Sequence, residues 1–149
     1  MTETDIETID TRTAPFGALL LRTALGAMYI VHGLVLKVMT FTLPGTAKFF
    51  ASLGFSEFVG YAIPFIEIAG GIALIVGLQV RAVSLALLPI LLGAIWFHAG
   101  NGWVFSAQGG GWEYPLFLAV ISIVQVFIGR GAYALSGDMA LPLLPASAR

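Results

Sequence analysis

The strongest constraint on this chain is the near absence of charge from its central part. Between Phe16 and Leu135 there are only eight charged side chains. Hydrophobic residues make up 58% of the sequence and charged residues 10%, against roughly 45–50% and 25% in an ordinary soluble domain. So few charges cannot cover a water-facing surface, and the sequence therefore predicts an integral membrane protein surrounded by a lipid bilayer. The net charge of −1 excludes an electrostatic footprint for nucleic acid.

Long apolar segments predict an all-α fold. Each segment approaches or reaches the roughly 20 residues that an α-helix needs to cross the hydrocarbon layer. Polar or glycine-rich sequence separates the segments, so we expect four membrane-crossing helices. The segments cover residues 16–36, 58–78, 82–97 and 114–128.

The connections predict how these helices are arranged. Residues 45–54 have the pattern of a short helix that lies at the membrane interface between the first and second crossings. The only turn between the second and third segments is Gln79-Val80-Arg81, which predicts a tight antiparallel hairpin. We expect an integral membrane antiparallel four-helix bundle over residues 14–135. A disordered cytoplasmic tail over residues 1–13 precedes it, and a C-terminal tail over residues 136–149 follows it.

The basic residues predict the orientation in the membrane. Cytoplasmic flanks of membrane helices are enriched in lysine and arginine. With the N-terminus inside, Lys37 and Lys48 fall outside and the arginines fall on or near the cytoplasmic side, so we expect both termini to be cytoplasmic. The arginines are Arg12, Arg22, Arg81, Arg130 and Arg149.

Glu67 is the most informative polar residue because it lies near the middle of its apolar segment. An ionised carboxylate there costs roughly 2.5–3.5 kcal/mol on insertion scales. The carboxyl group must therefore be paired, be protonated or face a cavity. One interpretation is a structural ion pair with Arg22 of the first helix, and another is a functional acid; both can hold together.

The two histidines of the chain, His32 and His98, are expected at the same outer level of the bundle. Each could simply cap a helix end or bond a loop carbonyl. Alternatively, they form a proton-accepting pair for a quinone carbonyl, or the axial ligands of a b-type haem, for which two histidines are the whole support. Glu113 stands where the helix dipole favours a carboxylate, and its place near His98 makes it a candidate ligand-binding residue.

Cysteine is absent from the chain. Disulfide exchange, iron–sulfur ligation and thiolate nucleophiles are therefore excluded within it. A redox role would need a bound cofactor or a partner protein, and we predict neither a metal site nor a covalently bound cofactor.

The order of these motifs resembles the DoxX family of small bacterial and archaeal membrane proteins, over about residues 16–135. The resemblance implies a four-helix protein of the cytoplasmic membrane. In some relatives it implies a link to respiratory or sulfur redox chemistry, including quinone-reducing thiosulfate oxidoreductases, and in others to oxidative-stress complexes. It assigns no proven role to single residues. The matching motifs are Leu21-Arg22 with Gly26, Val31-His32-Gly33 with Lys37, Phe65 to Gly71, His98, and Glu113-Tyr114.

Taken together, the sequence predicts the membrane subunit of a redox system that binds quinone or a similar apolar ligand. Electrons would come from a redox partner protein. The alternatives are a non-catalytic anchor or assembly protein for a partner oxidoreductase, and a small-solute carrier. Small-residue helix faces also allow a homo-oligomer. The predicted catalytic residues are His32, His98 and Glu67, and the predicted ligand-binding residues are Arg22, Tyr29 and Glu113.

Overall fold

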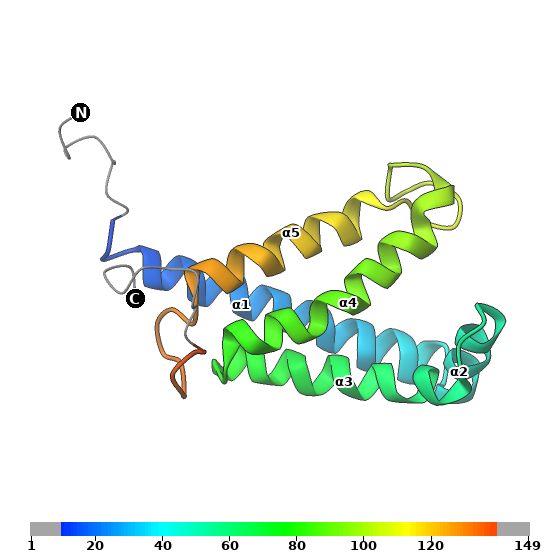
Figure 1. The fold of residues 1–149 in the computed structure, drawn as a ribbon, viewed down its shortest axis with the longest axis horizontal. Coiled ribbons are helices and arrows are strands. Elements are labelled where there is room, and N and C mark those ends of the chain that lie inside the picture. The colour runs from blue at the N-terminus through cyan, green and yellow to red at the C-terminus, as the bar shows by residue number, and fades with distance from the viewer. Residues whose placement is uncertain (1–9, 140–149) are drawn as a thin grey trace.

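The computed structural model describes residues 10–139, and this part of the chain is all-α, as predicted, with no β-strand (Figure 1). The predicted tails fall largely on residues 1–9 and 140–149, which lie outside the described residues. Short connections join the helices, apart from the glycine-rich loop of residues 102–112, which precedes the last one. The elements are α1 (Ala14–Ile30), η1 (Val31–Thr40), α2 (Leu43–Ser52), α3 (Glu57–Val76), α4 (Val80–His98), η2 (Ala99–Asn101) and α5 (Glu113–Ile128).

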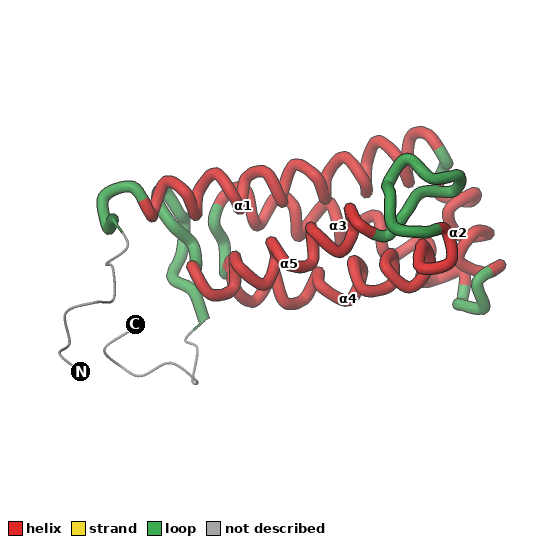
Figure 2. The backbone as a smooth tube through the Cα atoms, turned by 90° about the horizontal axis from the view of Figure 1, so that it is seen from above, coloured by secondary structure: helices red, strands yellow, loops and turns green. Residues whose placement is uncertain are grey.

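The long helices pack against one another in a ring. α1 packs against α3, α3 against α4, α4 against α5, and α5 against α1. Leu25, Leu74 and Leu87 are among the buried residues of the shared core. Figure 2 shows the helices running along one common direction, and Figure 1 shows the α4–α5 pair diverging from the α1–α3 pair towards the glycine-rich loop.

Three of these helical stretches are long and apolar enough to cross a membrane, namely Ala14–Thr40, Glu57–Val76 and Val80–Asn101. The predicted fourth crossing, α5, is apolar but has 16 residues, which corresponds to about 24 Å against roughly 30 Å of hydrocarbon. Large apolar side chains point away from the core, as in Phe58, which is 75% exposed. The chain is thus a multi-pass membrane protein with lipid-facing helices.

The contact between α1 and α3 depends on glycine. A Cβ atom added at Gly26 would lie 2.6 Å from the carbonyl oxygen of Gly71, and one added at Gly33 would lie 2.7 Å from that of Pro64. Two backbones can approach this closely only where one side lacks a side chain. These contacts fix the register of the antiparallel pair, in which Gly26 faces Gly71 and Gly33 faces Pro64.

The first helix is longer than predicted. The predicted apolar segment ends at residue 36, just before Lys37, but helical structure continues to Thr40 as a π-helix over Val31–Thr40. The amide of Phe41 accordingly donates to the carbonyl of Leu36, five residues back. Helical structure can continue past a charged residue here because the Lys37 side chain turns into the bundle rather than out of the membrane.

The two predicted short elements are confirmed with small shifts. α2 spans Leu43–Ser52 and is capped by the preceding Thr42, whose side chain accepts a bond from the backbone of Gly45. It packs on the start of α3. The hairpin between α3 and α4 turns at Gly77, which adopts a left-handed conformation with φ of 75°, and α4 begins two residues earlier than the predicted third segment.

Candidate functional site

Arg22 is fully buried but does not pair with Glu67, so the predicted ion pair is wrong. Its guanidinium donates instead to backbone carbonyls at the end of α3, those of Leu74 at 2.8 Å and of Ile75. It also donates to the carbonyls of the segment after α5, the first being Arg130 at 2.9 Å from Nε, with Ala132 and Tyr133 following. Arg22 therefore ties three parts of the chain together at one end of the bundle.

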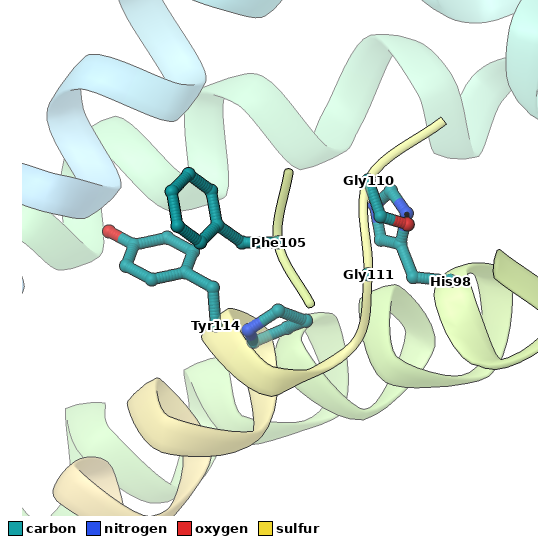
Figure 3. Close-up of a pocket in the computed structure, with 6 residues that line it drawn as sticks. His98, Phe105, Gly110, Gly111 and Tyr114 are labelled. Carbon is teal, nitrogen blue, oxygen red and sulfur yellow. Dashed lines mark hydrogen bonds between the residues drawn. The ribbon is translucent and has the colours of Figure 1, made fainter. Parts of the chain in front are cut away.

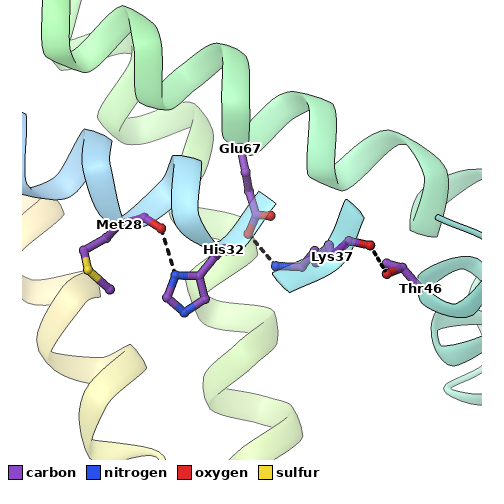
Figure 4. Close-up of polar contacts among 5 residues, drawn as sticks. All are labelled: Met28, His32, Lys37, Thr46 and Glu67. Carbon is purple, nitrogen blue, oxygen red and sulfur yellow. Dashed lines mark hydrogen bonds and ion pairs between the residues drawn. The ribbon is translucent and has the colours of Figure 1, made fainter. Parts of the chain in front are cut away.

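The partner of Glu67 is Lys37, whose ammonium lies 2.8 Å from Oε1 (Figure 4). The Glu67 side chain is 3% exposed and that of Lys37 is 20% exposed. The Lys37 backbone is held as well, since its carbonyl accepts a bond from the Thr46 hydroxyl of α2 at 2.9 Å. In the sequence, Lys37 stood out as an outward-facing basic residue and as part of the family motif, and it was not among the predicted site residues.

Tyr29 is buried on the core side of α1, at 5% exposure. Its hydroxyl lies near the side chains of Ser122 on α5 and Glu67 on α3. Neither this hydroxyl nor Oε2 of Glu67 has a hydrogen-bond partner among the described residues. The predicted ligand-binding Tyr29 thus lies in the bundle interior.

His32 has one ring nitrogen committed to the backbone. Nδ1 lies 2.8 Å from the carbonyl oxygen of Met28, one turn earlier on the same helix. Because a carbonyl only accepts, Nδ1 carries the proton and Nε2 holds a lone pair in the neutral ring. The ring stacks on Tyr114 at the start of α5, with centroids 6.4 Å apart.

His98, at the end of α4, is held in the same way by the glycine-rich loop. Its Nδ1 lies 3.0 Å from the carbonyl oxygen of Gly109 and 3.1 Å from that of Gly110. The Asn101 amide donates to both of these carbonyls, each at 2.9 Å. This fixes the loop over the imidazole and again leaves Nε2 as the free ring nitrogen.

Glu113 organises the same loop. Its Oε1 accepts a bond from the backbone amide of Phe105 at 2.8 Å, while the amide of Glu113 donates to the carbonyl of Trp103 at 3.1 Å. Trp103 and Trp112 pack edge to face, with centroids 4.5 Å apart. The loop is therefore an ordered cover at this end of α4 and α5.

Between this cover and α5 lies an open pocket of ≈ 460 Å³ (Figure 3). A second hollow of ≈ 450 Å³ adjoins it and shares Phe105 and Tyr114, with Glu113 in its wall. The walls of both are mainly apolar. In the first pocket, His98 supplies a basic ring nitrogen. The first pocket is lined by His98, Phe105, Gly110, Gly111, Tyr114 and Pro115.

Comparison with known proteins identifies the family of this chain. A sequence model of the family described as DoxX matches residues 17–100, which is more than half of the chain. The chain belongs to the DoxX family. A protein of Bacillus subtilis (strain 168) named "Putative oxidoreductase CatD" is 40% identical over 79 residues, which are 53% of this chain and 57% of that protein. The chain thus spans little more than half the length of this relative, and no solved structure matches it.

In this DoxX protein the predicted site residues fall into three places. His98 and Glu113 lie at the pockets under the glycine-rich loop, with His32 behind Tyr114. Glu67 and Tyr29 lie in the bundle interior, and Arg22 lies at the opposite end. The six residues do not line one pocket in the described part of the chain, and their catalytic and binding roles stay predictions.

Two aromatic residues of the pocket, Tyr114 and Phe105, were not among the predicted site residues. Tyr114 stood out in the sequence as part of the Glu113-Tyr114 motif and as an aromatic residue at a helix end, where tyrosine usually anchors a helix at the membrane interface. Phe105 belongs to a loop whose course depends on the Glu113 contact. The signal that could have found both is their position beside His98 and Glu113, in the part of the DoxX protein that follows the matched residues.

Proposed function

We propose that this DoxX protein is a membrane component of a redox system and binds a quinone, or a similarly flat apolar ring, in the pocket beside His98. The observation that carries the proposal is the combination of a mainly apolar, aromatic wall with one imidazole whose orientation is fixed. Ligand sites are typically apolar with a few placed polar groups. The name of the Bacillus subtilis relative, an oxidoreductase, agrees with redox chemistry.

The residues of the pocket fit such a ring. Tyr114 and Phe105 offer aromatic surfaces on which a flat ring packs favourably. With Nδ1 donating to the loop, Nε2 of His98 can accept a hydrogen bond and a proton from a hydroxyl group, and in its protonated form can return that proton to a carbonyl.

A bound quinone would supply two-electron, two-proton redox chemistry. The chain itself has no cysteine and no other side chain that carries electrons in this way. Electrons would therefore pass to or from a partner oxidoreductase, while His98 moves a proton and the apolar wall holds the ring. His32 has the same free Nε2 and stacks on Tyr114, which lines the pocket, so it is the candidate for the second proton.

The membrane setting forms part of the proposal. α5 completes a fourth crossing if the bilayer thins locally or the flanking residues extend to the interface, as they do for short spans. The start of α1 and the end of α5 then lie on the same side, together with Arg22, Arg81 and Arg130, and this side is cytoplasmic by the distribution of basic residues. The pocket would open near the outer surface of the bacterial or archaeal membrane.

The test is calorimetric titration of the purified protein in detergent with a short-chain ubiquinone. His98→Asn keeps an N–H donor near the position of Nδ1 for the loop carbonyls but has no group at the position of Nε2, so we expect affinity to fall roughly tenfold, the effect of one hydrogen bond to a buried group. Trp96→Leu is the matched control, because Trp96 lies two residues away and is 63% exposed. No quinone binding by the wild type, or equal binding by His98→Asn, would refute the proposal.

One observation favours the alternative of an anchor or assembly protein without a ligand. Arg22, His32, His98 and Glu113 all bond backbone atoms and so contribute to the fold. In that case His98→Asn lowers thermal stability, no quinone binds, and the partner oxidoreductase leaves the membrane fraction when the protein is deleted. Co-purification of a tagged chain from native membranes measures this outcome directly.

A further inference from the structure

Five buried polar atoms inside the bundle have no hydrogen-bond partner among the described residues. They come from α1, α3, α4 and α5, and their residues are at most 5% exposed. Few polar atoms in native protein interiors lack a hydrogen bond, and those without a protein partner usually bind a buried water molecule. The atoms are the Tyr29 hydroxyl, Glu67 Oε2, the Ser84 and Ser122 hydroxyls, and Gln125 Oε1.

The helix registers give the order of these residues along the bundle. Ser84 and Ser122 lie at nearly the same level of the antiparallel α4–α5 pair, because Arg81 bonds the carbonyl of Val126 at 3.0 Å and fixes that register. Gln125 lies about one turn further towards the end of α5. Tyr29 stands on the other side of the serines, with Ser122 and Glu67 both near its hydroxyl.

The two ends of this row lie towards the two ends of the bundle. At one end Glu67 bonds Lys37, whose side chain is 20% exposed. At the other end the Gln125 amide donates to the carbonyl of Gly129, which directly precedes the exposed Arg130 at the end of α5. The row therefore runs from the glycine-rich loop end of the bundle to the end that Arg22 closes.

We propose that water fills this row and that the row conducts protons along the bundle, with Glu67 as the group that takes up and releases each proton. Hydroxyl groups both donate and accept hydrogen bonds, so serine and tyrosine can join successive waters into a continuous chain. The inference does not depend on quinone binding.

The charges around Glu67 suit this role. Lys37, His32 and Tyr29 are the titratable side chains that face it, all from α1 and η1. Lys37 bonds Oε1, which leaves Oε2 open towards the interior for an incoming proton. A proton that binds Oε2 neutralises the carboxylate, and its onward transfer to the next water restores the ion pair, so no atom or electron is gained or lost.

The experiment uses the full chain in liposomes with a pH-sensitive dye inside and a potassium gradient that valinomycin converts into a voltage. We expect the wild type to change the internal pH faster than protein-free liposomes, and Glu67→Gln to abolish the difference. Tyr29→Phe and Ser122→Ala should each slow the flux roughly tenfold, as expected when one hydrogen bond is lost on the path. A wild-type flux equal to that of Glu67→Gln or of empty liposomes overturns the proposal.

Matched control variants distinguish the loss of the proton path from general damage to the fold. Tyr61→Phe removes a partly exposed tyrosine hydroxyl from α3, and Thr23→Val removes a hydroxyl that bonds the carbonyl of Leu19; neither should change the flux. Thermal unfolding gives a second readout if Glu67→Gln does not fold. A water-bound Ser122 hydroxyl predicts a lower Tm for Ser122→Ala, whereas an unchanged or higher Tm means that the hydroxyl is unpaired and no water row exists.

Discussion

A side chain on an α-helix leans towards the N-terminus of its own helix. On the antiparallel α1 and α3, Lys37 and Glu67 therefore lean towards each other, although their backbones are not level. Arg22 leans along the first helix in the same direction as Lys37, but from its position this direction leads away from Glu67 and towards the end of α3, where the last carbonyls of a helix lack partners within it. The direction of lean thus selects Lys37 rather than Arg22 as the partner of Glu67.

The two members of this pair are unequally buried, which predicts unequal mutational effects. Lys37→Met leaves the Glu67 carboxylate buried without a partner, and such losses cost roughly 3–5 kcal/mol. Glu67→Gln leaves an ammonium that is one-fifth exposed and can turn to water, so it should cost less. Chemical denaturation in detergent measures both variants.

The double variant Lys37→Met with Glu67→Leu removes both charges and should recover most of the stability lost by Lys37→Met. Lys48→Met is the control, since Lys48 is exposed on α2. Glu67→Leu is measured alone as well, and a double variant whose loss equals the sum of the two single losses would show that the two side chains do not interact.

At the scale of elements, the lengths of the apolar segments predicted the helices to within a few residues. The predicted segment 58–78 corresponds to α3 at Glu57–Val76, and the segment 82–97 to α4 at Val80–His98. The end of the first helix and the partner of Glu67 could not be predicted, because both depend on how α1 slides along α3. Hydropathy along a single chain carries no information on that register.

The register itself depends on glycines, which gives a prediction at this scale. Gly26→Ala would place a methyl group 2.6 Å from the carbonyl oxygen of Gly71 and push α1 away from α3, at a cost of roughly 1–3 kcal/mol. Gly17→Ala, on the same helix with nothing within 4 Å of the added atom, should be neutral or stabilising because alanine favours helix. Equal Tm values for the two variants would contradict the close contact.

At the scale of the whole molecule, the two ends of the bundle differ in construction. One end is closed by the segment that follows α5, which Arg22 holds through its carbonyls and which returns along the end of α3, where the Leu135 amide donates to Val76. The other end carries α2 and the glycine-rich loop that lies over His98. A lipid-soluble ligand would meet the apolar pocket at this second end, and arginines gather at the first.

This difference between the two ends predicts a membrane topology that depends on whether α5 crosses the bilayer. α5 is the shortest of the long helices, with 16 residues. Because the chain has no cysteine, single cysteines can be introduced at Ser52, Ser106, Thr11 and Leu135 and labelled with a membrane-impermeant maleimide in intact cells. If α5 crosses, Ser52→Cys and Ser106→Cys label from outside, while Thr11→Cys and Leu135→Cys label only after permeabilisation. Ser106 and Leu135 are separated by α5 alone, so labelling of both from the same side would show that α5 lies along the membrane and that three helices cross it.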